Sequence, residues 1–168
     1  KLDTFFVEEG DRSNFGVDVT GLIGQYAHGN EPSHHIAYLY NYVGHQEKCA
    51  ERVRQILTEL YFDDHSGVCG NEDAGQMSAW YVLSAIGLYQ VDPAAGEFQF
   101  GSPIVHKATL NVGGGKTFTV IAHNNSMENI YIQDVKLNGK PHAGTSITYD
   151  QIKAGGTLEF TMGATPVK

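Results

Sequence analysis

The chain has 168 residues, 41% of them hydrophobic and 18% charged, which is the composition of a globular protein with a core of ordinary size. Its formal net charge is −8 and it has no stripe of lysine or arginine, so nucleic acid is not an expected partner. No run approaches the roughly 18 apolar residues that a membrane span needs, so no span is expected.

The first half of the chain has the hydrophobic spacing of helices. Pro32 suits a first helical turn, and the pattern after it predicts a helix that stops at Gly44. The apolar positions of this helix are Ile36, Leu39, Tyr40 and Val43. A second, clearer helix has an apolar stripe made of Cys49, Ala50, Val53, Ile56, Leu57 and Leu60. The charged residues largely off that stripe are Glu51, Arg52, Arg54 and Glu59.

A third helix is predicted over residues 75–86, with Gly87 as its C-cap. Its apolar stripe consists of Met77, Trp80, Tyr81, Ser84 and Ala85. The first two helices are joined at Gly44 and His45, so they are expected to be antiparallel neighbours.

After Pro93 the period changes to the alternation of β-strands. The predicted strands cover 107–112, 117–122, 130–137 and 157–162. Glycines 113–115 and the pair 138–139 indicate hairpin turns. The predicted fold class is therefore α+β, with a helical part over 1–93 and an antiparallel β module over 94–168.

Two polar, glycine-flexed loops carry most of the candidate chemistry, and each leads directly into a predicted helix. Residues 28–35 read His-Gly-Asn-Glu-Pro-Ser-His-His, and residues 70–76 read Gly-Asn-Glu-Asp-Ala-Gly-Gln. In the first loop, Asn30 and Glu31 offer oxygens that either cap the helix or bind a hard cation such as Ca²⁺. A zinc site is not expected, because adjacent histidines such as those at 34 and 35 point to different sides of a helix.

Asp73 in the second loop has two compatible interpretations. With Gln76 it has the spacing of a capping box, in which Asp73 is the N-cap residue of the third helix. Alternatively, Asp73 is a general base, with Asn71 and Glu72 positioning water or sugar hydroxyls. A cap residue can be held rigid while its second oxygen faces a cleft, so the spacing excludes neither.

Other hydrolase chemistries find no support in the sequence. Cys49 and Cys69 are too few for a disulfide scaffold, and the sequence leaves open whether they pair. Neither lies in a nucleophile motif, and no Gly-x-Ser-x-Gly elbow exists. No glycine-rich loop opens a helix in the way a phosphate site requires.

The chain closely resembles the C-terminal part of glycoside hydrolase family 92, whose members are calcium-dependent, exo-acting α-mannosidases abundant in gut Bacteroidetes. Three segments carry the resemblance: Gly-Asn-Glu-Pro-Ser-His-His at 29–35, Glu-Arg-Val-Arg-Gln-Ile at 51–56, and Gly-Asn-Glu-Asp-Ala-Gly-Gln-Met-Ser-Ala-Trp-Tyr-Val at 70–82. Phe-Gly-Ser-Pro at 100–103 and the glycine pair at 155–156 also look like that family's closing segment. The resemblance therefore covers nearly the whole chain.

The resemblance implies a β-sandwich followed by an (α/α)6 barrel, with this chain as the last barrel helices and the closing antiparallel strands. It also implies inversion by a general acid and a carboxylate base, assisted by a Ca²⁺ on the mannose O2 and O3. Asp73 matches the base and Asn71 its helper, while Asn30 and Glu31 match calcium ligands. The expected substrate contacts are His28, Glu31, His34, His35 and Glu72.

The family's general acid lies upstream of the residues present, so the chain alone is expected to lack turnover and to need the missing N-terminal part of the same enzyme. The sequence also opens Lys-Leu-Asp with no Met, as expected of a processed product or a piece of something longer. Expected substrates are mannose-containing glycans, and the expected location is the periplasm, cell surface or medium of a bacterium. The alternative is a non-catalytic carbohydrate-binding or structural module.

Overall fold

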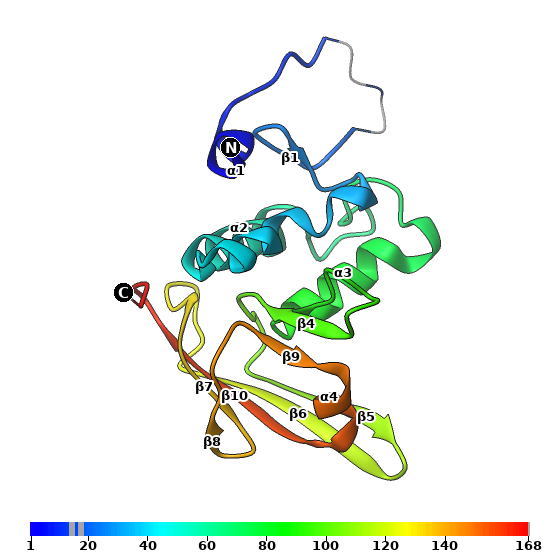
Figure 1. The fold of residues 1–168 in the computed structure, drawn as a ribbon. Helices are drawn as coiled ribbons and strands as arrows, with labels where there is room; N and C mark the ends of the chain where they lie inside the picture. Colours follow the sequence, from blue (N-terminus) through cyan, green and yellow to red (C-terminus); the bar gives the residue numbers. More distant parts are fainter. Residues whose placement is uncertain (14–15, 17–18, 168) are drawn as a thin grey trace.

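A computed structural model of the protein describes residues 1–13, 16 and 19–167. A helical layer packs on a five-stranded sheet, with a three-stranded sheet between them (Figure 1). The helices are α1 (Leu2–Val7), α2 (Gln46–Glu59), α3 (Gln76–Ala85) and α4 (Tyr149–Ala154), with 3-10 helices η1 (Glu31–Ser33), η2 (Ile36–Val43) and η3 (Asp73–Gly75). The strands are β1 (Leu22–Ile23), β2 (Tyr26–Ala27), β3 (Leu88–Tyr89), β4 (Glu97–Phe100), β5 (Lys107–Gly113), β6 (Lys116–His123), β7 (Tyr131–Leu137), β8 (Lys140–Pro141), β9 (Ser146–Thr148) and β10 (Gly156–Gly163). No helix in these ranges is long and apolar enough to cross a membrane.

The five-stranded sheet has the order β5-β6-β10-β7-β8, and its four long strands match the four predicted from alternation. The turn at glycines 113–115 joins β5 to β6 as an antiparallel hairpin, and the turn at Asn138 and Gly139 joins β7 to β8 as a second one. Asn138 and Gly139 at the second turn have φ of 52° and 74°. Left-handed φ at both central residues is what a two-residue type I′ turn requires, so both turn predictions are confirmed.

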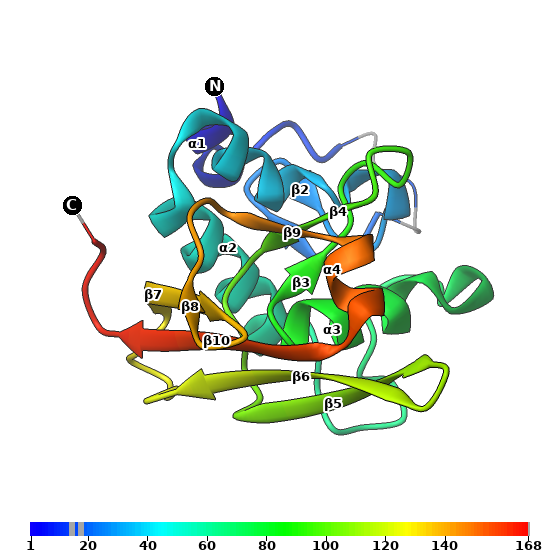
Figure 2. The ribbon, with the colours of Figure 1, turned by 60° about the horizontal axis from the view of Figure 1, so that its bottom comes forward.

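The sheet is mixed rather than purely antiparallel, which corrects the prediction. β10 is antiparallel to β7 but parallel to β6. The chain leaves the sheet after β8, passes through β9 and α4, and re-enters between β6 and β7 (Figure 2). Alternation in the sequence fixes which face of a strand is buried, but not the direction of its neighbour, so it could not reveal this crossover.

Each layer has its own hydrophobic core. The sheet core consists of Ile86, Leu88, Phe100, Phe118, Val120, Ala122, Ile132, Val135, Ile147, Ile152, Leu158, Phe160 and Met162. The helical core consists of Phe6, Ile23, Tyr26, Ala37, Tyr38, Tyr40, Cys49, Val53, Ile56, Leu57, Trp80 and Ala85. Ile86 and Leu88 come before the predicted boundary at residues 93 and 94 but belong to the sheet core. One core therefore contains residues from both sides of that boundary. The domain division at that point stays a prediction.

The segment after Pro32 forms 3-10 helices rather than the predicted helix at α-helical spacing. The buried residues of η2 are Ala37, Tyr38, Tyr40 and Asn41, whereas Val43 is exposed and Ile36 and Leu39 are half-buried. A 3-10 helix has three residues per turn, so of the four positions in a stripe read at 3.6 residues per turn only Tyr40 is buried. Gly44 ends η2 with a left-handed φ of 75°, as predicted.

The predicted stripes of α2 and α3 are largely confirmed. In α2, all the predicted stripe residues within the helix are buried, while Leu60 just beyond its end is half-buried. In α3, Tyr81 is half-buried and the other stripe residues are buried. Gly87 follows α3 with φ of 90° and donates its N–H to the Ser84 carbonyl at 2.9 Å, which is the expected C-terminal stop.

Arg54, predicted to lie off the stripe of α2, is only 6% exposed and ties the helix to the β-rich half. Its guanidinium donates to the Ser102 hydroxyl, to the Pro103 carbonyl at 2.6 Å and to Asn125 Oδ1 at 3.0 Å. It also donates to the Ser126 carbonyl at 2.9 Å. These acceptors lie in the segments before β5 and after β6, so Arg54 joins the helical layer to the five-stranded sheet.

The two cysteines are free thiols, which answers the question that the sequence left open. Cys49 is buried in the helical core, and its Sγ donates to the Phe100 carbonyl at 3.7 Å. Cys69 is half-buried, and a Cβ added at Gly21 would lie 2.5 Å from its sulfur. The two thiols therefore serve in packing, at different places in the helical part.

Candidate functional site

The two polar loops lie against each other, backbone to backbone. A Cβ added at Gly70 would lie 2.7 Å from the Gly29 Cα, so the two glycines allow a contact that no side chain would permit. A second contact joins Gln76 Nε2 to His34 Nδ1 at 3.2 Å. The fold thus brings together two segments that are far apart in the sequence.

We expect Gly70→Ala to lower the free energy of unfolding by about 2–4 kcal/mol, because the new methyl overlaps the Gly29 backbone at an unfavourable φ of +85°. The matched control is Gly44→Ala. Gly44 has φ of +75° but open space around an added Cβ, so only the backbone cost of about 1 kcal/mol applies. Urea unfolding followed by the fluorescence of Trp80, the one tryptophan, measures both variants. Equal losses would contradict a tight contact between the loops.

His28 is fully buried, and each of its ring nitrogens meets a tyrosine hydroxyl. The Tyr26 hydroxyl lies 2.8 Å from Nδ1 and the Tyr61 hydroxyl 2.6 Å from Nε2. Because the Tyr61 hydroxyl donates to the Met77 carbonyl at 3.2 Å, it accepts from Nε2–H, and Nδ1 accepts from Tyr26. Burial and the nearby His34 lower the pKa of His28 from 6.5 to about 3. Sequence reasoning missed both tyrosines, because no motif connects them to this loop.

This low pKa predicts a pH-dependent stability. Between pH 6.5 and about 3 the unfolded chain protonates His28 while the folded chain keeps it neutral, so stability falls as pH drops. We expect His28 to add up to about 1.4 kcal/mol per pH unit to the fall between pH 6 and 5. Urea unfolding at several pH values should show a weaker pH dependence of the free energy of unfolding in His28→Gln than in wild type. Parallel profiles for wild type and His28→Gln would refute the assignment.

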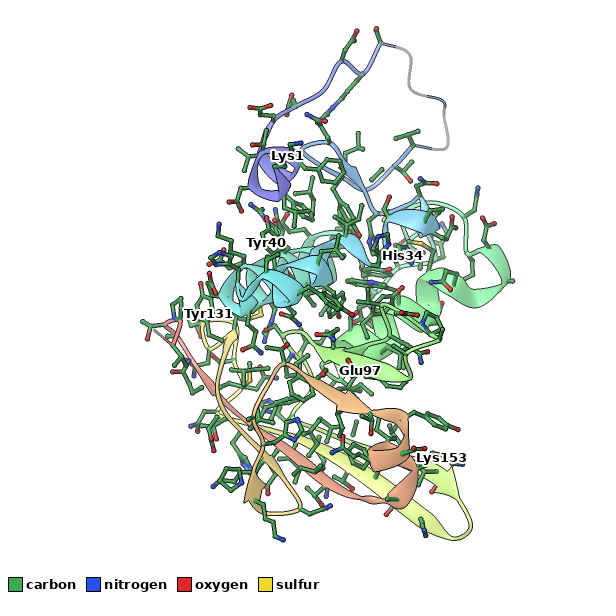
Figure 3. The ribbon with its side chains drawn as sticks, in the orientation of Figure 1. Lys1, His34, Tyr40, Glu97, Tyr131 and Lys153 are labelled. Carbon is green, nitrogen blue, oxygen red and sulfur yellow. The ribbon has the colours of Figure 1, made fainter. Side chains whose placement is uncertain are left out.

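His34 lies in the helical half of the molecule (Figure 3). It is buried, and its ring neighbours are His28 and Trp80. Its Nε2–H donates to the His28 carbonyl at 3.0 Å, which leaves Nδ1 to accept from Gln76. The indole N–H of Trp80 donates to the His34 carbonyl, also at 3.0 Å. Burial lowers the pKa of His34, against opposing effects of the His28 carbonyl and Glu31. Substrate contact by these two histidines stays a prediction, and the protein itself engages both nitrogens of each ring.

The other predicted residues of the first loop lie apart from that pair. His35 is half-buried and faces an apolar hollow of about 400 Å³ lined also by Lys1, Leu2, Phe5, Ile36 and Leu39. Asn30 is exposed, and its carbonyl accepts from Ser33 N–H at 2.9 Å. The adjacent histidines therefore point to different sides, as the sequence predicted.

The acidic residues of the second loop are exposed just before α3. Glu72 Oε1 accepts from the Ser78 backbone N–H at 3.1 Å, so this carboxylate is tied to the first turn of α3. Asn71 and Asp73 flank Glu72 and are exposed as well. The loop thus presents an amide and two carboxylates on one short, solvent-accessible segment.

The capping-box prediction for Asp73 is wrong, because the N-cap residue of α3 is Gly75. Asp73, Ala74 and Gly75 have φ of 34°, 57° and 89°, a run of left-handed residues that turns the chain sharply before the helix. Such conformations cost a non-glycine residue on the order of 1–3 kcal/mol and occur preferentially at functional positions. A geometry this unusual cannot be read from residue spacing.

One oxygen of the Glu31 carboxylate points to a cation site. Its Oε1 is buried, and among the described residues it has no hydrogen-bond donor; the same holds for Thr20 Oγ1. A buried acceptor oxygen without a donor fits a hard cation, which takes six to eight oxygen ligands. The described residues hold no cluster of three or more His, Cys, Asp or Glu side chains arranged for a metal. The fit to Ca²⁺ is therefore partial, with most ligands required from elsewhere.

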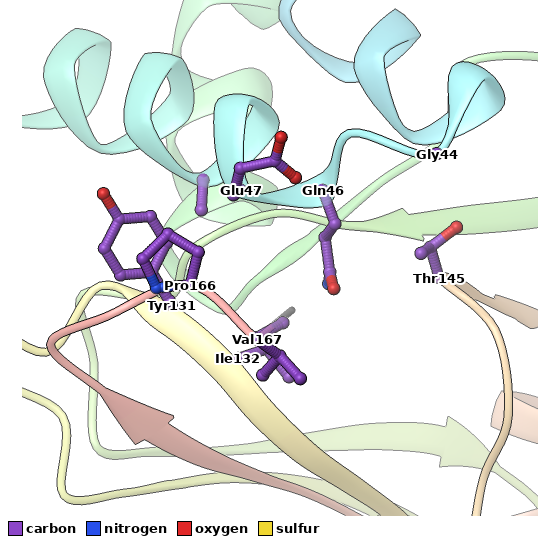
Figure 4. A pocket seen from close by; sticks show the side chains of 9 residues that line it. Gly44, Gln46, Glu47, Tyr131, Ile132, Thr145, Pro166 and Val167 are labelled. Carbon is purple, nitrogen blue, oxygen red and sulfur yellow. The ribbon is translucent and has the colours of Figure 1, made fainter.

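A separate cavity of about 260 Å³ lies between the start of α2, strand β7 and the C-terminal segment (Figure 4). Its lining residues are Gly44, Gln46, Glu47, Ala50, Tyr131, Ile132, Thr145, Pro166 and Val167. The Tyr131 hydroxyl donates to Glu51 at 2.8 Å, and Glu47 is held by His45 at 2.9 Å. None of the predicted site residues lines this cavity, so it is distinct from the two loops.

Comparison with known proteins identifies the family. Residues 1–164 match the glycosyl hydrolase family 92 catalytic domain. The structure of the family GH92 α-mannosidase BT3965 from Bacteroides thetaiotaomicron in complex with mannoimidazole is 40% identical, with a TM-score of 0.94 over 99% of this chain and 22% of that chain. The inverting GH92 mannosidase BT2199 from the same organism is 38% identical, with a TM-score of 0.83 over 98% of this chain and 24% of that one.

An uncharacterized secreted glycosidase from Arthroderma benhamiae is 33% identical over 138 residues, which are 80% of this chain and 18% of that protein. The chain thus spans about a fifth of the length of the relatives it matches. Within that fifth the match runs almost from end to end and includes both polar loops. On this match in sequence and structure, the chain belongs to glycosyl hydrolase family 92.

Proposed function

We propose that this chain acts as the C-terminal part of an exo-acting, inverting, calcium-dependent α-mannosidase that trims mannose from glycans. The observation that carries the proposal is the contact between the two polar loops at Gly29 and Gly70, within a family that contains α-mannosidases. We infer that the three major helical segments, η2, α2 and α3, are the last helices of an (α/α)6 barrel.

In this proposal Asp73 is the general base. An inverting hydrolase needs a carboxylate that removes a proton from water while the water attacks the anomeric carbon, and a general acid about 6.5–9.5 Å away that protonates the leaving oxygen. The strained, exposed turn at Asp73 holds its carboxylate at the surface of the loop, where a water molecule has access. Asn71 and Glu72 orient that water and the sugar hydroxyls. The acid comes from a part of the enzyme outside these 168 residues.

The first loop binds the sugar and the cation in this proposal. Asn30 and Glu31 would hold Ca²⁺, with Glu31 Oε1, which has no hydrogen-bond donor among the described residues, as a ligand. Bound Ca²⁺ would supply positive charge and coordination for two sugar hydroxyls. His28, His34 and His35 would shape or contact the mannose, and the buried positions of the first two favour an indirect role.

The substrates are mannose-containing glycans, and the partner is the N-terminal remainder of the same polypeptide. We infer a location outside the cytoplasm, in the periplasm or at the surface of a bacterium, supported by the secreted fungal relative.

Two measurements test this proposal. The 168-residue chain with Ca²⁺ and an aryl α-mannoside should show no turnover above buffer, because one of the two carboxyl groups is absent. The reading frame that encodes Lys1 should extend upstream by several hundred codons, and its full product should hydrolyse the mannoside. If the short chain hydrolyses the mannoside and Asp73→Asn abolishes this turnover, the claim that the general acid lies outside these 168 residues is wrong. A full product without turnover would favour the alternative, a carbohydrate-binding or structural module.

A further inference from the structure

Gln76 connects the two polar loops through the ring of His34. Its Nε2 lies 3.2 Å from His34 Nδ1. Gln76 is the first residue of α3 and follows Asp73 closely in the chain, while His34 follows Glu31 closely at the end of η1. The bond therefore joins the segment of the proposed base to the segment of the proposed cation site.

The surroundings of His34 set the direction of this bond. Its Nε2 lies 3.0 Å from the His28 carbonyl, and a carbonyl only accepts, so Nε2 carries the hydrogen. The residue is 1% exposed, and burial disfavours a second proton with its charge. Nδ1 is therefore an acceptor, and the Gln76 amide must turn its NH₂ group toward the ring. The contact thus requires a side chain at position 76 that has this length and ends in a donor.

The helix α3 holds His34 at a second point. The indole N–H of Trp80 donates to the His34 carbonyl at 3.0 Å. Gln76 and Trp80 are one helical turn apart, so they lie on the same face of α3. A single hydrogen bond would leave the helix free to pivot about the contact, whereas two bonds one turn apart fix both its position and its rotation. His34 therefore fixes the start of α3 against the first loop.

The turn that carries Asp73 ends at this anchored position. Residues 73–75 all have left-handed φ, a costly conformation that persists only where the surrounding structure holds it. The backbone N–H groups of Gly75 and Gln76 donate to the Glu72 carbonyl at 3.1 and 3.0 Å and close the turn. The Gln76 side chain therefore anchors the end of the turn that leads into the helix.

We propose that Gln76 is a positioning residue, which binds His34 and thereby fixes the Asp73 carboxylate relative to the first loop. This rests on the role of Asp73 as the general base that is proposed above. Without the donor at position 76, the strained turn is free to relax toward ordinary backbone conformations, and the carboxylate moves away from the water that it activates. A displacement of about 1 Å at a reacting group costs on the order of 100-fold in rate.

Kinetics of the longer enzyme, the full polypeptide of the proposal above, test the effect on the base. Gln76→Met keeps the length of the side chain but removes the donor, and it should lower kcat for an aryl α-mannoside by about 10- to 100-fold. KM should change by less than about threefold, because the base acts only in the transition state. If Gln76 served only the stability of the fold, Gln76→Met would lower Tm and leave the kcat of the folded enzyme unchanged.

The matched control is Gln46→Met. Gln46 is likewise the half-buried first residue of a helix, α2, and it lines the separate cavity rather than the two loops. This variant should retain wild-type kcat. Measurement of Tm for both variants shows that each is folded at the temperature of the assay.

A double variant tests whether Gln76 acts through His34. His34→Phe keeps a ring but removes the acceptor, so it should lower kcat at least as much as Gln76→Met does. Adding Gln76→Met to His34→Phe should then change kcat by less than about threefold, because the bond is already lost. Losses that multiply in the double variant would show that Gln76 acts by another route, and would overturn the proposal.

Amide hydrogen exchange in the 168-residue chain gives a readout that needs no turnover. The amides of residues 75 and 76, which close the turn, should exchange at least about 10-fold faster in Gln76→Met than in wild type and at the wild-type rate in Gln46→Met. Unchanged exchange in Gln76→Met, or a kcat of its folded enzyme within about threefold of wild type, would overturn the proposal. Faster exchange together with a longer enzyme that has no turnover would contradict the proposed activity and still confirm that Gln76 holds the turn.

Discussion

Asp73→Asn in the longer enzyme should lower kcat by two to four orders of magnitude, the usual contribution of a positioned general base. The amide keeps the size of the side chain, so the left-handed turn at residues 73–75 should persist, particularly since asparagine tolerates positive φ. KM should change much less than kcat, because water activation is needed only in the transition state. Initial rates with an aryl α-mannoside across a range of concentrations measure both constants.

The control for Asp73→Asn is Asp64→Asn. Asp64 is an exposed carboxylate in the preceding loop, and its Oδ1 accepts from Ser66 N–H at 2.9 Å, a bond that an asparagine oxygen can also accept. This control should retain wild-type kcat. A kcat for Asp73→Asn within about threefold of wild type would remove Asp73 from the chemistry and favour the non-catalytic module.

Arg54→Met should lower the free energy of unfolding of the 168-residue chain by about 3–5 kcal/mol. Methionine retains much of the apolar stem but removes the donors to the Pro103 and Ser126 carbonyls and to Asn125 Oδ1. Each buried acceptor left without a donor costs about 1–3 kcal/mol. Because these acceptors lie in the β-rich half, the loss should loosen the junction of the two layers. Urea unfolding followed by Trp80 fluorescence measures the change.

Arg52→Met is the matched control, on the same helix but half-buried, where the guanidinium donates to Gln55 at 2.8 Å. Its guanidinium also lies over the Phe6 ring, so a loss of about 0.5–1 kcal/mol is expected. If the two variants lost equal stability, the buried network of Arg54 would not be what joins the layers.

Periodicity in the sequence was a good guide to the regular elements of this fold and a poor guide to their connections. The stripe of α2 and the four long strands follow directly from residue spacing. The parallel pairing of β6 and β10 depends on a crossover that no local pattern encodes. The burial of Arg54 depends on acceptors 48 to 72 residues away in the sequence, so its position in α2 gave no signal.

For the candidate site, the sequence located the two loops, but the roles of their residues stay predictions and the surroundings of those residues could not be read from it. Both polar loops were identified from their composition and their resemblance to a family, and the fold brings them into contact at Gly29 and Gly70. The enclosure of His28 by two tyrosines follows from tertiary packing alone. The assignment of Asp73 as a capping residue failed because three successive left-handed residues displace the helix start to Gln76.

The most direct test of the central claim, that the two loops form one face of a mannose site, is a crystal structure of the longer enzyme with Ca²⁺ and mannoimidazole, the ligand of the BT3965 complex. The ligand ring should lie between Glu31 and Asp73, with Ca²⁺ bound by Glu31 and a water molecule between Asp73 and the anomeric carbon. A ring bound elsewhere, with neither carboxylate in contact with the ligand, its water or the cation, would contradict the claim.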